Sequence, residues 1–223
     1  MTLGNMGALV EGNLSNPFEI LGPHEVEHQG RKALAIRAYL PGTKQVWVLD
    51  QSHGVSRPMR RIHPAGVYEA ICPMSGGDAG GYQLRVANER GQIMTMQDPY
   101  AFPTYFTDFD LYLLGEGTHY QSYDRLGAQL RTVNGVTGVN FAVWAPNAGS
   151  VSVVGDFNQW DGRQHMMRKH VPSGIWELFV PGLQAGMPYK FRVRTRWGES
   201  IDKSDPYGFA AELPPCTASI VAD

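Results

Sequence analysis

Hydrophobic and polar residues alternate along short segments of the chain with a period of two, and helical periodicity is scarce. Val, Ile, Phe, Tyr and Trp are concentrated in these segments, and Gly, Pro, Asn and Asp separate them. Gly91 and Gly198 each stand in a turn between two segments, where glycine readily takes positive φ. The pattern predicts antiparallel strands near residues 33–40, 45–50, 66–72, 80–87, 92–97, 139–145, 150–155, 174–180, 187–195 and 199–204.

The chain contains two copies of one sequence pattern. Residues 98–102 (DPYAF) return as 205–209 (DPYGF), and 82–86 (YQLRV) return as 189–193 (YKFRV), both at an offset of 107 residues (205 − 98 and 189 − 82). This period is far longer than a solenoid repeat, so each copy is expected to be a small domain. The spacing of the strands predicts an all-β fold of two tandem immunoglobulin-like β-sandwiches joined by a short helical linker.

The two copies fall out of register at one place. Their offset is 105 residues up to Val46 and Val151, and 108 residues from Met59 and Met167 onward. The second copy therefore carries three extra residues, and they fall within 155–162 (GDFNQWDG). Because loops diverge with function while frameworks are shared for packing, this loop is the first candidate for a functional site.

A distinct segment connects the two copies. Asp108 is a candidate N-cap for a short helix through Leu114, and Gly115 is the candidate stop. The segment is too apolar for a free linker, so we expect it to pack between the sandwiches and fix their orientation. Its large apolar side chains are Tyr105, Phe106, Phe109, Leu111, Leu113 and Leu114. The expected boundaries are 16–102 for the first sandwich, 103–126 for the linker and 127–223 for the second sandwich.

Composition narrows the range of partners. The formal net charge is −2, so neither nucleic acid nor an anionic membrane is expected. Alternating basic residues are interpreted as the solvated face of a strand; they are Lys190, Arg192, Arg194 and Arg196. Cys72 and Cys216 occupy non-equivalent places in the copies, which favours reduced thiols in a cytoplasmic protein. The N-terminal residues do not resemble a signal peptide, and no apolar stretch approaches the ~20 residues that span a bilayer.

The sequence offers no pattern typical of catalysis. The seven histidines lack the spacing of metal ligands, and neither a glycine-rich phosphate loop nor a nucleophile elbow is present. The acidic residues occur at turns and at a helix start, where capping accounts for them: Asp108, Asp110, Asp156, Asp161, Asp202 and Asp205. We therefore expect no catalytic residue, metal or cofactor in this chain.

Trp160 is the strongest candidate for binding. A strand leads into its polar loop, where Phe157 is expected to point inward and Trp160 to stay exposed. An exposed indole can stack on the apolar face of a glucose ring, while Asn158 and Lys190 bond to its hydroxyls. Trp197 is a second exposed candidate. Two alternatives remain open: Trp160 covers the sandwich edge as a lid, or Trp197 packs against the linker or a catalytic partner.

These residues resemble a known family. The loop 155–162, followed by Tyr189-Lys190-Phe191 and by Ser204-Asp205-Pro206-Tyr207, resembles the glycogen- and starch-binding module of branching enzymes and of the AMP-activated protein kinase β subunit. Residues 16–24 (NPFEILGPH) and 110–119 (DLYLLGEGTH) are similar to the N-terminal half of bacterial 1,4-α-glucan branching enzymes, as is Leu126-Gly127-Ala128 leading into 135–139. The resemblance covers residues 16–222.

The resemblance implies Trp160 as the stacking platform, with Asn158 and Lys190 as hydroxyl partners. Trp197 precedes its turn glycine, whereas the second Trp of the kinase module follows the turn. The first copy has no Trp at the position of Trp160 and has Gln83 in place of Lys190, so its sugar site is expected to be absent; Trp47 stays unassigned.

The family's transferase chemistry implies a (β/α)8 barrel of about 250 residues. The chain shows no alternating βα pattern and ends at Asp223, about where that barrel is expected. The resemblance thus implies an N-terminal part, inactive alone, that binds α-1,4-glucan, glycogen or maltooligosaccharide and adjoins the catalytic barrel. A purely structural brace for that barrel and a regulatory module like the kinase subunit are the alternatives.

Overall fold

The computed structural model describes residues 3–50, 54–73 and 81–223. The chain divides into two compact units. The first sandwich is Phe18–Phe102, and the second sandwich comprises Pro103–Asp223 together with the residues up to Pro17. None of the helices in the described part of the chain is long and apolar enough to cross a membrane.

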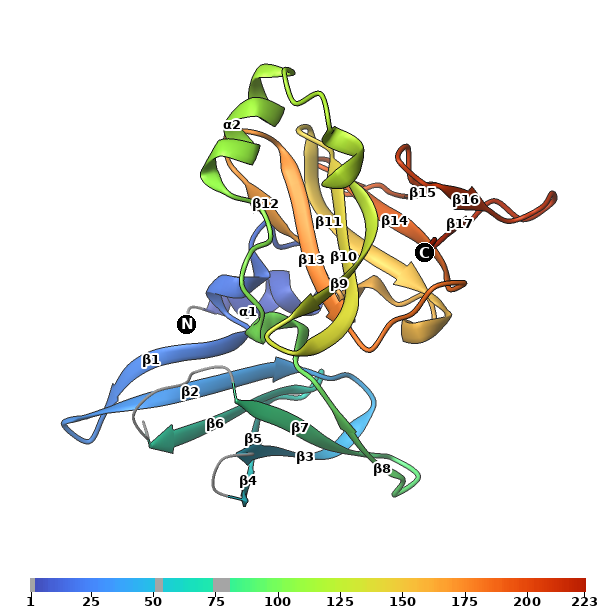
Figure 1. Ribbon diagram of the computed structural model, residues 1–223. Helices are drawn as coiled ribbons and strands as arrows, with labels where there is room; N and C mark the ends of the chain where they lie inside the picture. Colours follow the sequence, from blue (N-terminus) through green and yellow to red (C-terminus); the bar gives the residue numbers. More distant parts are fainter. Residues whose placement is uncertain (1–2, 51–53, 74–80) are drawn as a thin grey trace. The chain divides into compact units, whose positions relative to one another are not determined.

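The first sandwich consists of two four-stranded sheets (Figure 1). One sheet has the order β1-β2-β6-β5 and the other the order β4-β3-β7-β8. Tyr68, Leu84 and Ile36 are among the side chains that form the core between them. The strands are β1 (Gly22–His28), β2 (Arg31–Tyr39), β3 (Thr43–Asp50), β4 (Val55–Pro58), β5 (Arg60–His63), β6 (Val67–Pro73), β7 (Tyr82–Asn88) and β8 (Ile93–Met96), with the short helices η1 (Pro17–Glu19) and η2 (Pro99–Ala101) at the ends.

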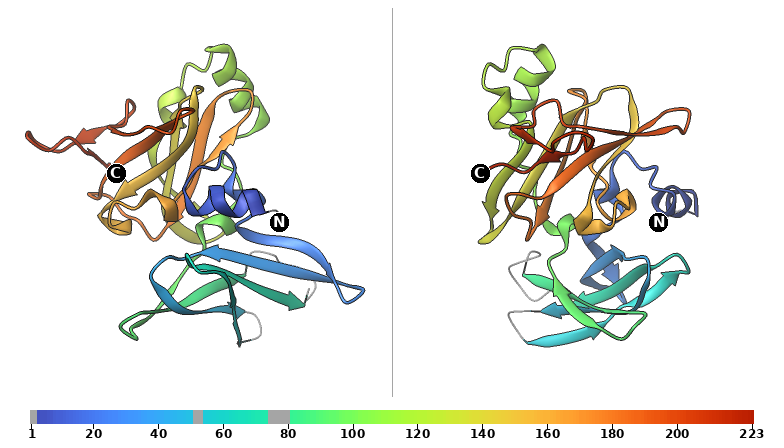
Figure 2. Two further views of the ribbon diagram at one scale, coloured as in Figure 1. Left: turned by 180° about the vertical axis from the view of Figure 1, so that it is seen from behind. Right: turned by 90° about the vertical axis from the view of Figure 1, so that its right-hand side faces the viewer.

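The second sandwich repeats this plan. One sheet has the order β12-β13-β10-β9; the other has the order β11-β14-β17-β16, with β15 paired to β14. Figure 2 shows the layers from two further directions. The strands are β9 (Gly127–Val133), β10 (Val136–Trp144), β11 (Ala148–Gly155), β12 (Arg168–His170), β13 (Ile175–Pro181), β14 (Pro188–Thr195), β15 (Ser200–Lys203), β16 (Ala210–Ala211) and β17 (Ser219–Ile220). The helices are α1 (Leu3–Val10), α2 (Asp108–Glu116), η3 (Ser122–Asp124), η4 (Asp156–Asn158) and η5 (Gly162–Gln164).

Both units are antiparallel, which confirms the all-β, immunoglobulin-like prediction. In the second sandwich, Phe141 of β10 contacts Tyr189 and Phe191 of β14 through edge-on aromatic pairs 5.0 and 6.5 Å apart. The alternation along β14 explains this packing, because Tyr189 and Phe191 point inward while Lys190 and Arg192 point outward. Burying these rings stabilises the sandwich by roughly 1.5–3 kcal/mol for each side chain.

The repeat in the sequence is a repeat in the structure. Tyr82 donates a 2.6 Å hydrogen bond to Oδ2 of Asp98, and Tyr189 donates the equivalent bond to Oδ2 of Asp205. All four side chains are buried. The other oxygen of each carboxylate accepts the backbone N–H two residues later. A buried carboxylate needs such partners, which explains why both copies keep the same residues at an offset of 107.

The three-residue insertion also lies where the sequence offsets indicate. Met59 N–H donates to Val46 O at 2.8 Å, and Met167 N–H donates to Val151 O at 2.9 Å. These two bonds pair equivalent residues on either side of the loop. The shorter loop of the first copy, around 50–55, lies partly outside the described residues, as does the start of the strand expected at 80–87.

The linker helix α2 begins differently from the sequence prediction. Its N-cap is Thr107 rather than Asp108, because the Thr107 side chain accepts from Asp110 N–H while the Asp110 carboxylate accepts from Thr107 N–H. This capping box satisfies two otherwise unpaired donors. The helix continues through Glu116 and ends at Gly117, with φ +72°, rather than at Gly115. Gly117 is suited to this cap because glycine carries no Cβ.

The linker packs on the second sandwich. Phe106, together with Leu111 and Leu114, joins a cluster with Ala142 of β10 and Ile175 of β13. Buried Glu177 accepts hydrogen bonds from Tyr105 N–H at 2.6 Å and from Thr104 Oγ1 at 2.7 Å. Burial alone would raise the pKa of Glu177, but the bonds from His170 and the linker and the charge of Arg168 hold it below its usual value. Phe109, expected to be packed, is 68% exposed.

The residues before the first sandwich also join the second. Ser150 donates to Gly12 O and Arg194 to Glu11 O, both at 2.9 Å. The N–H of Lys169 donates to Ser15 O at 2.8 Å.

The half-buried thiol of Cys72 and the exposed thiol of Cys216 are both free.

Candidate functional site

The loop after β11 has an unusual backbone at Trp160. Gln159 and Trp160 both take the left-handed conformation, with φ of +55° and +59°. Each such residue costs on the order of 1–3 kcal/mol, so the conformation persists only where its surroundings impose it. Consecutive non-glycine residues of this kind point to a loop that is shaped to place one side chain.

Asn158 imposes part of this shape. Its Oδ1 accepts from Gly155 N–H at 3.0 Å, and its Nδ2 lies 2.9 Å from Val153 O and 3.0 Å from His165 Nδ1. The side chain is 3% exposed. The sequence prediction of a hydroxyl partner at Asn158 therefore needs correction, because both amide donors and the carbonyl are occupied inside the loop. Asn158 acts as a support for the position of Trp160.

His165 and Phe157 complete the base of the loop. Burial lowers the pKa of His165 to about 4, so its imidazole is neutral at pH 7 and Nδ1 can accept from the Asn158 amide. The ring of Phe157 stacks 6.3 Å from Phe141, as the inward orientation expected from the sequence requires. A Cβ on Gly155 would lie 2.5 Å from this ring, so only glycine fits there.

Trp160 is held from both ends. Its Nε1 donates a 2.8 Å hydrogen bond to Oδ1 of Asp156, and its carbonyl accepts a 3.0 Å bond from Nη1 of Arg192. The residue is partly buried, whereas the sequence predicted an exposed side chain. The hydrogen bond to Asp156 fixes the direction of the indole.

Polar groups flank Trp160 on the outer face of β14. Arg192 forms a two-point ion pair with Asp202 of β15, at 2.7 and 2.8 Å. The hydrogen bond from Arg192 lowers the pKa of Asp202, and the charge of Lys190 lowers it further. Lys190 donates a 2.6 Å bond to Thr217 Oγ1. Because an ammonium group has three donors, Lys190 can still donate to a ligand.

A hollow of about 280 Å³ lies beside these groups. Arg192, Arg194, Ser152 and the ion pair between Asp161 and Arg163 are among its lining residues. The Arg163 guanidinium approaches Asp161 within 2.7 Å, and this hydrogen bond holds the pKa of Asp161 below its usual value. The hollow is therefore polar and charged, and it borders the loop that presents Trp160.

Trp197 lies outside the Trp160 loop. It is 90% exposed in the turn between β14 and β15. It follows Arg192, which contacts the Trp160 carbonyl, by five residues, on the order of 15 Å along an extended chain. In the first sandwich, Trp47 is partly buried, with the Arg85 guanidinium 5.9 Å from its ring centroid.

Sequence reasoning missed the groups that fix Trp160. Asp156 and Asp202 were interpreted as turn residues, and Arg192 as a solvated strand residue. The alternation of Lys190 and Arg192 along β14 is visible in the sequence, but the contact of Arg192 with a loop carbonyl is not. Across residues 3–50, 54–73 and 81–223, no group of three or more His, Cys, Asp or Glu side chains could hold a metal ion.

Two family models match the chain. Residues 125–208 match Carbohydrate-binding module 48 (Isoamylase N-terminal domain), which covers both β11 and β14 and the Trp160 loop. Residues 3–100 match the alpha-1,4-glucan branching enzyme GlgB, N-terminal domain. The second sandwich is thus a module of the carbohydrate-binding class.

Related proteins extend this result over the whole chain. The 1,4-alpha-glucan branching enzyme GlgB of Rhodopirellula baltica is 50% identical over 223 residues, which are 100% of this chain and 30% of the relative. That of Thermosynechococcus vestitus is 47% identical over 216 residues, 96% of this chain and 28% of the relative. The chain therefore spans about 30% of the length of these relatives, and it belongs to the N-terminal region of the GlgB branching-enzyme family.

Proposed function

We propose that the second sandwich binds α-1,4-glucan chains on its β11–β14 face, with Trp160 as the stacking platform. The observation that carries this proposal is the strained loop that holds one indole in place. The loop is supported by the buried Asn158 amide and by the hydrogen bonds of Trp160 with Asp156 and Arg192. Strain that is maintained by buried hydrogen bonds around a single aromatic residue is typical of a functional site. A lid that only covered the sandwich edge would need no such backbone.

The flanking groups suit a sugar. The apolar C–H face of a glucose unit stacks on an indole, and covering about 80 Å² of apolar surface contributes roughly 2 kcal/mol. Lys190, Thr217 and Asp202 then offer donors and acceptors for hydroxyl groups at the rim. Trp197, in the turn that follows β14, offers a second stacking surface. The match to a carbohydrate-binding module supports this assignment.

In a full-length branching enzyme, this site would hold glucan chains close to the catalytic (β/α)8 barrel. Such retention raises the local concentration of the chain being processed without any new contact at the reacting bond. A weak affinity serves this role, in the micromolar to millimolar range, or about −8 to −4 kcal/mol. The chain is expected to bind glucan, or maltooligosaccharide, without catalysing its transfer.

The test replaces the indole. Trp160→Ala is expected to weaken retention in a glycogen affinity gel, and maltoheptaose binding by calorimetry, by at least about fivefold. Trp144→Phe is the matched control, because Trp144 is 57% exposed on the other sheet of the same sandwich. Both variants should keep the circular dichroism spectrum of the parent chain. Unchanged retention of Trp160→Ala would contradict the proposal.

A structural brace is the second candidate. Phe209 and Leu213, in the segment between β15 and β17, are 61% and 85% exposed. Such apolar exposure favours contact with another domain. A purely bracing role predicts that maltoheptaose changes no chemical shift in the chain, whereas Phe209→Ser and Leu213→Ser lower its tendency to associate.

A further inference from the structure

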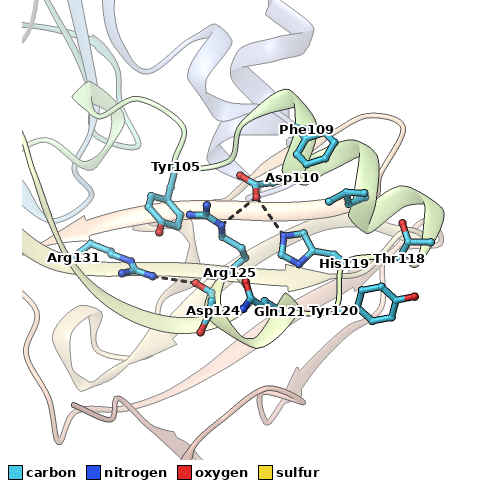
Figure 3. Close-up of a pocket in the computed structure, with 11 residues that line it drawn as sticks. Tyr105, Phe109, Asp110, Thr118, His119, Tyr120, Gln121, Asp124, Arg125 and Arg131 are labelled. Atoms are coloured by element: carbon cyan, nitrogen blue, oxygen red, sulfur yellow. Dashed lines mark hydrogen bonds and ion pairs between the residues drawn. The ribbon is translucent and has the colours of Figure 1, made fainter.

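The second sandwich has a pocket that the Trp160 site does not use. It has a volume of about 740 Å³ and is formed by α2, η3 and the segments around them (Figure 3). We call it the α2 pocket; Tyr105, Phe109, Asp110, His119, Tyr120 and Arg131 are among its lining residues. The linker that forms it packs on β10 and β13, so it lies on the opposite sheet from β11 and β14. Pockets that bind organic ligands typically measure 300–1,000 Å³.

Asp110 makes the α2 pocket rigid. Its carboxylate accepts from Thr107 N–H at 3.0 Å and Thr107 Oγ1 at 2.7 Å within the capping box. The same carboxylate receives Arg125 Nε at 3.2 Å and lies 3.3 Å from His119 Nε2, as Figure 3 shows. One buried group therefore fixes the helix start, the histidine and the arginine together. A site held in this way needs little reorganisation to bind.

Tyr105 forms one side of the pocket. The guanidinium carbons of Arg125 and Arg131 lie 4.6 and 4.8 Å from the centroid of its ring. Arg131 also donates from Nη2 to Asp124 O at 3.0 Å. These contacts engage the ring of Tyr105, so it is not the surface on which a ligand would stack.

Two residues that line the α2 pocket each carry a buried nitrogen with no hydrogen-bond partner in the described residues: His119 Nδ1 and Arg131 Nε. Arg131 Nε is always a donor, and an imidazole nitrogen donates or accepts according to its tautomer. Leaving buried polar groups unpaired costs about 1–3 kcal/mol each, so a ligand that pairs them as the side chains adjust gains part of that energy. A hydroxyl group both donates and accepts, and a ligand with several hydroxyls satisfies both atoms.

The charges of the α2 pocket favour a neutral ligand. Asp110 and Asp124 balance Arg125 and Arg131. An anion could pair with Arg131, but the carboxylate of Asp110, which lines the same pocket, would repel it. A polyhydroxyl ligand without charge fits both the unpaired atoms and the balance.

Two aromatic residues at the α2 pocket remain open to solvent. Tyr120 is 93% exposed and Phe109 is 68% exposed. Tyr120 directly follows His119, whose side chain contacts Asp110. This contact restrains the backbone from which the Tyr120 side chain projects. Exposed aromatic rings beside polar groups are the combination that binds sugar rings. We propose that the α2 pocket is a second binding site for a neutral glucan chain, separate from the Trp160 site.

Two sites on opposite faces of one sandwich make the module bivalent. A branched glucan could contact both, and the second contact would then be intramolecular, which raises retention beyond that of either site. The α2 pocket itself rests on its own geometry. Its ligand class follows from the unpaired atoms, the charge balance and the aromatic rim. A negative result at the Trp160 site would therefore leave the proposal for the α2 pocket unaffected.

The experiment is a titration of the isotope-labelled full chain with maltoheptaose, observed by NMR of the backbone amides. In the parent chain, two groups of amides are expected to shift, 156–162 and 105–131. Trp160→Ala should remove only the first group. Tyr120→Ala should weaken binding at the second group at least about fivefold and leave the first unchanged.

Tyr112→Ala is the matched control, because Tyr112 is 60% exposed on α2 but does not line the pocket. It should leave both groups of shifts intact. If the amides of 105–131 do not respond to about 10 mM maltoheptaose, the second site is refuted while the proposed function can still hold. If inorganic phosphate shifts them and maltoheptaose does not, the assignment to a neutral glucan is also overturned. Shifts at 105–131 without shifts at 156–162 would contradict only the Trp160 site.

Discussion

The Nε1 of Trp160 donates to Oδ1 of Asp156, four residues earlier, at 2.8 Å. The carboxylate belongs to an exposed residue, so the bond contributes little to the stability of the fold. Its effect is to fix the direction of the indole, which otherwise projects from a strained backbone. A ligand that stacks on the ring then loses less entropy on binding, because the platform is already ordered.

Asp156→Ala is therefore predicted to weaken maltoheptaose binding about three- to tenfold while the melting temperature stays nearly constant. The indole remains present in this variant, but its orientation is no longer held. Isothermal calorimetry measures the affinity. Asp156→Asn keeps an acceptor for Nε1 and should bind like the parent chain; equal losses in both variants would show that charge, not orientation, matters.

Asn158→Ala is predicted to lower the free energy of unfolding of the second sandwich by about 2–4 kcal/mol. The change leaves Gly155 N–H, Val153 O and His165 Nδ1 without their partner in a buried place. Denaturant unfolding followed by circular dichroism checks the value.

Gln159→Gly is the matched control for this loop. Gln159 is exposed and has φ +55°, so glycine relieves strain without removing a buried partner. The variant should be as stable as the parent or more stable by up to about 1 kcal/mol. A destabilised Gln159→Gly together with a neutral Asn158→Ala would contradict the role assigned to the Asn158 amide.

The second sandwich is predicted to lose stability between pH 6.5 and 4 through His165. Burial lowers the pKa of this imidazole to about 4, from 6.5. In that window the unfolded chain binds the proton and the folded chain does not, so acid favours unfolding. The free energy of unfolding should fall by up to about 3 kcal/mol from this group as the pH drops.

Chemical denaturation at a series of pH values measures this loss. His165→Gln offers an acceptor to Asn158 but does not titrate, so its curve should be flatter than that of the parent chain. Parallel curves would show that folding does not lower the pKa of His165.

The stability of the first sandwich is predicted to change with pH in the opposite direction, through Asp98. Burial raises the pKa of this carboxyl group to about 6, although the bond from Tyr82 works against the rise. Between pH 4 and 6 the folded chain holds the proton more tightly than the unfolded chain. Its contribution is therefore present at low pH and is lost as the pH rises through 6, by up to about 3 kcal/mol.

Asp98→Asn should remove this decline, because the amide keeps an acceptor for Tyr82 and carries no charge. Site-specific hydrogen exchange distinguishes the two sandwiches within one sample. A stability of the first sandwich that rises from pH 4 to 6 would contradict this assignment.

The sequence predicted the framework because the framework repeats. Alternation along β14 and the shared offset of Tyr82 and Tyr189 define strands, register and the insertion before Met167 without coordinates. It also singled out Trp160, since an indole among polar residues has no place in a core. What it could not show is that Asn158 turns inward, because an amide in a turn looks the same whether it serves a ligand or the loop.

Other differences have local reasons. The capping box at Thr107 was readable, since an acidic residue stands three positions later, but Asp108 is also a good N-cap. The helix α1 was not predicted, and its glycines Gly4 and Gly7 are poor helix formers. Phe109 was expected to be packed because it is apolar, and it faces solvent beside the α2 pocket. These outcomes depend on tertiary contacts that no short window of sequence contains.

The same tyrosine–aspartate bond in both sandwiches has a consequence for protein engineering. The pair is buried in each domain, while the edge loops of the two domains differ in length. A loop of this kind can therefore be exchanged between the copies without touching the interior that both of them share.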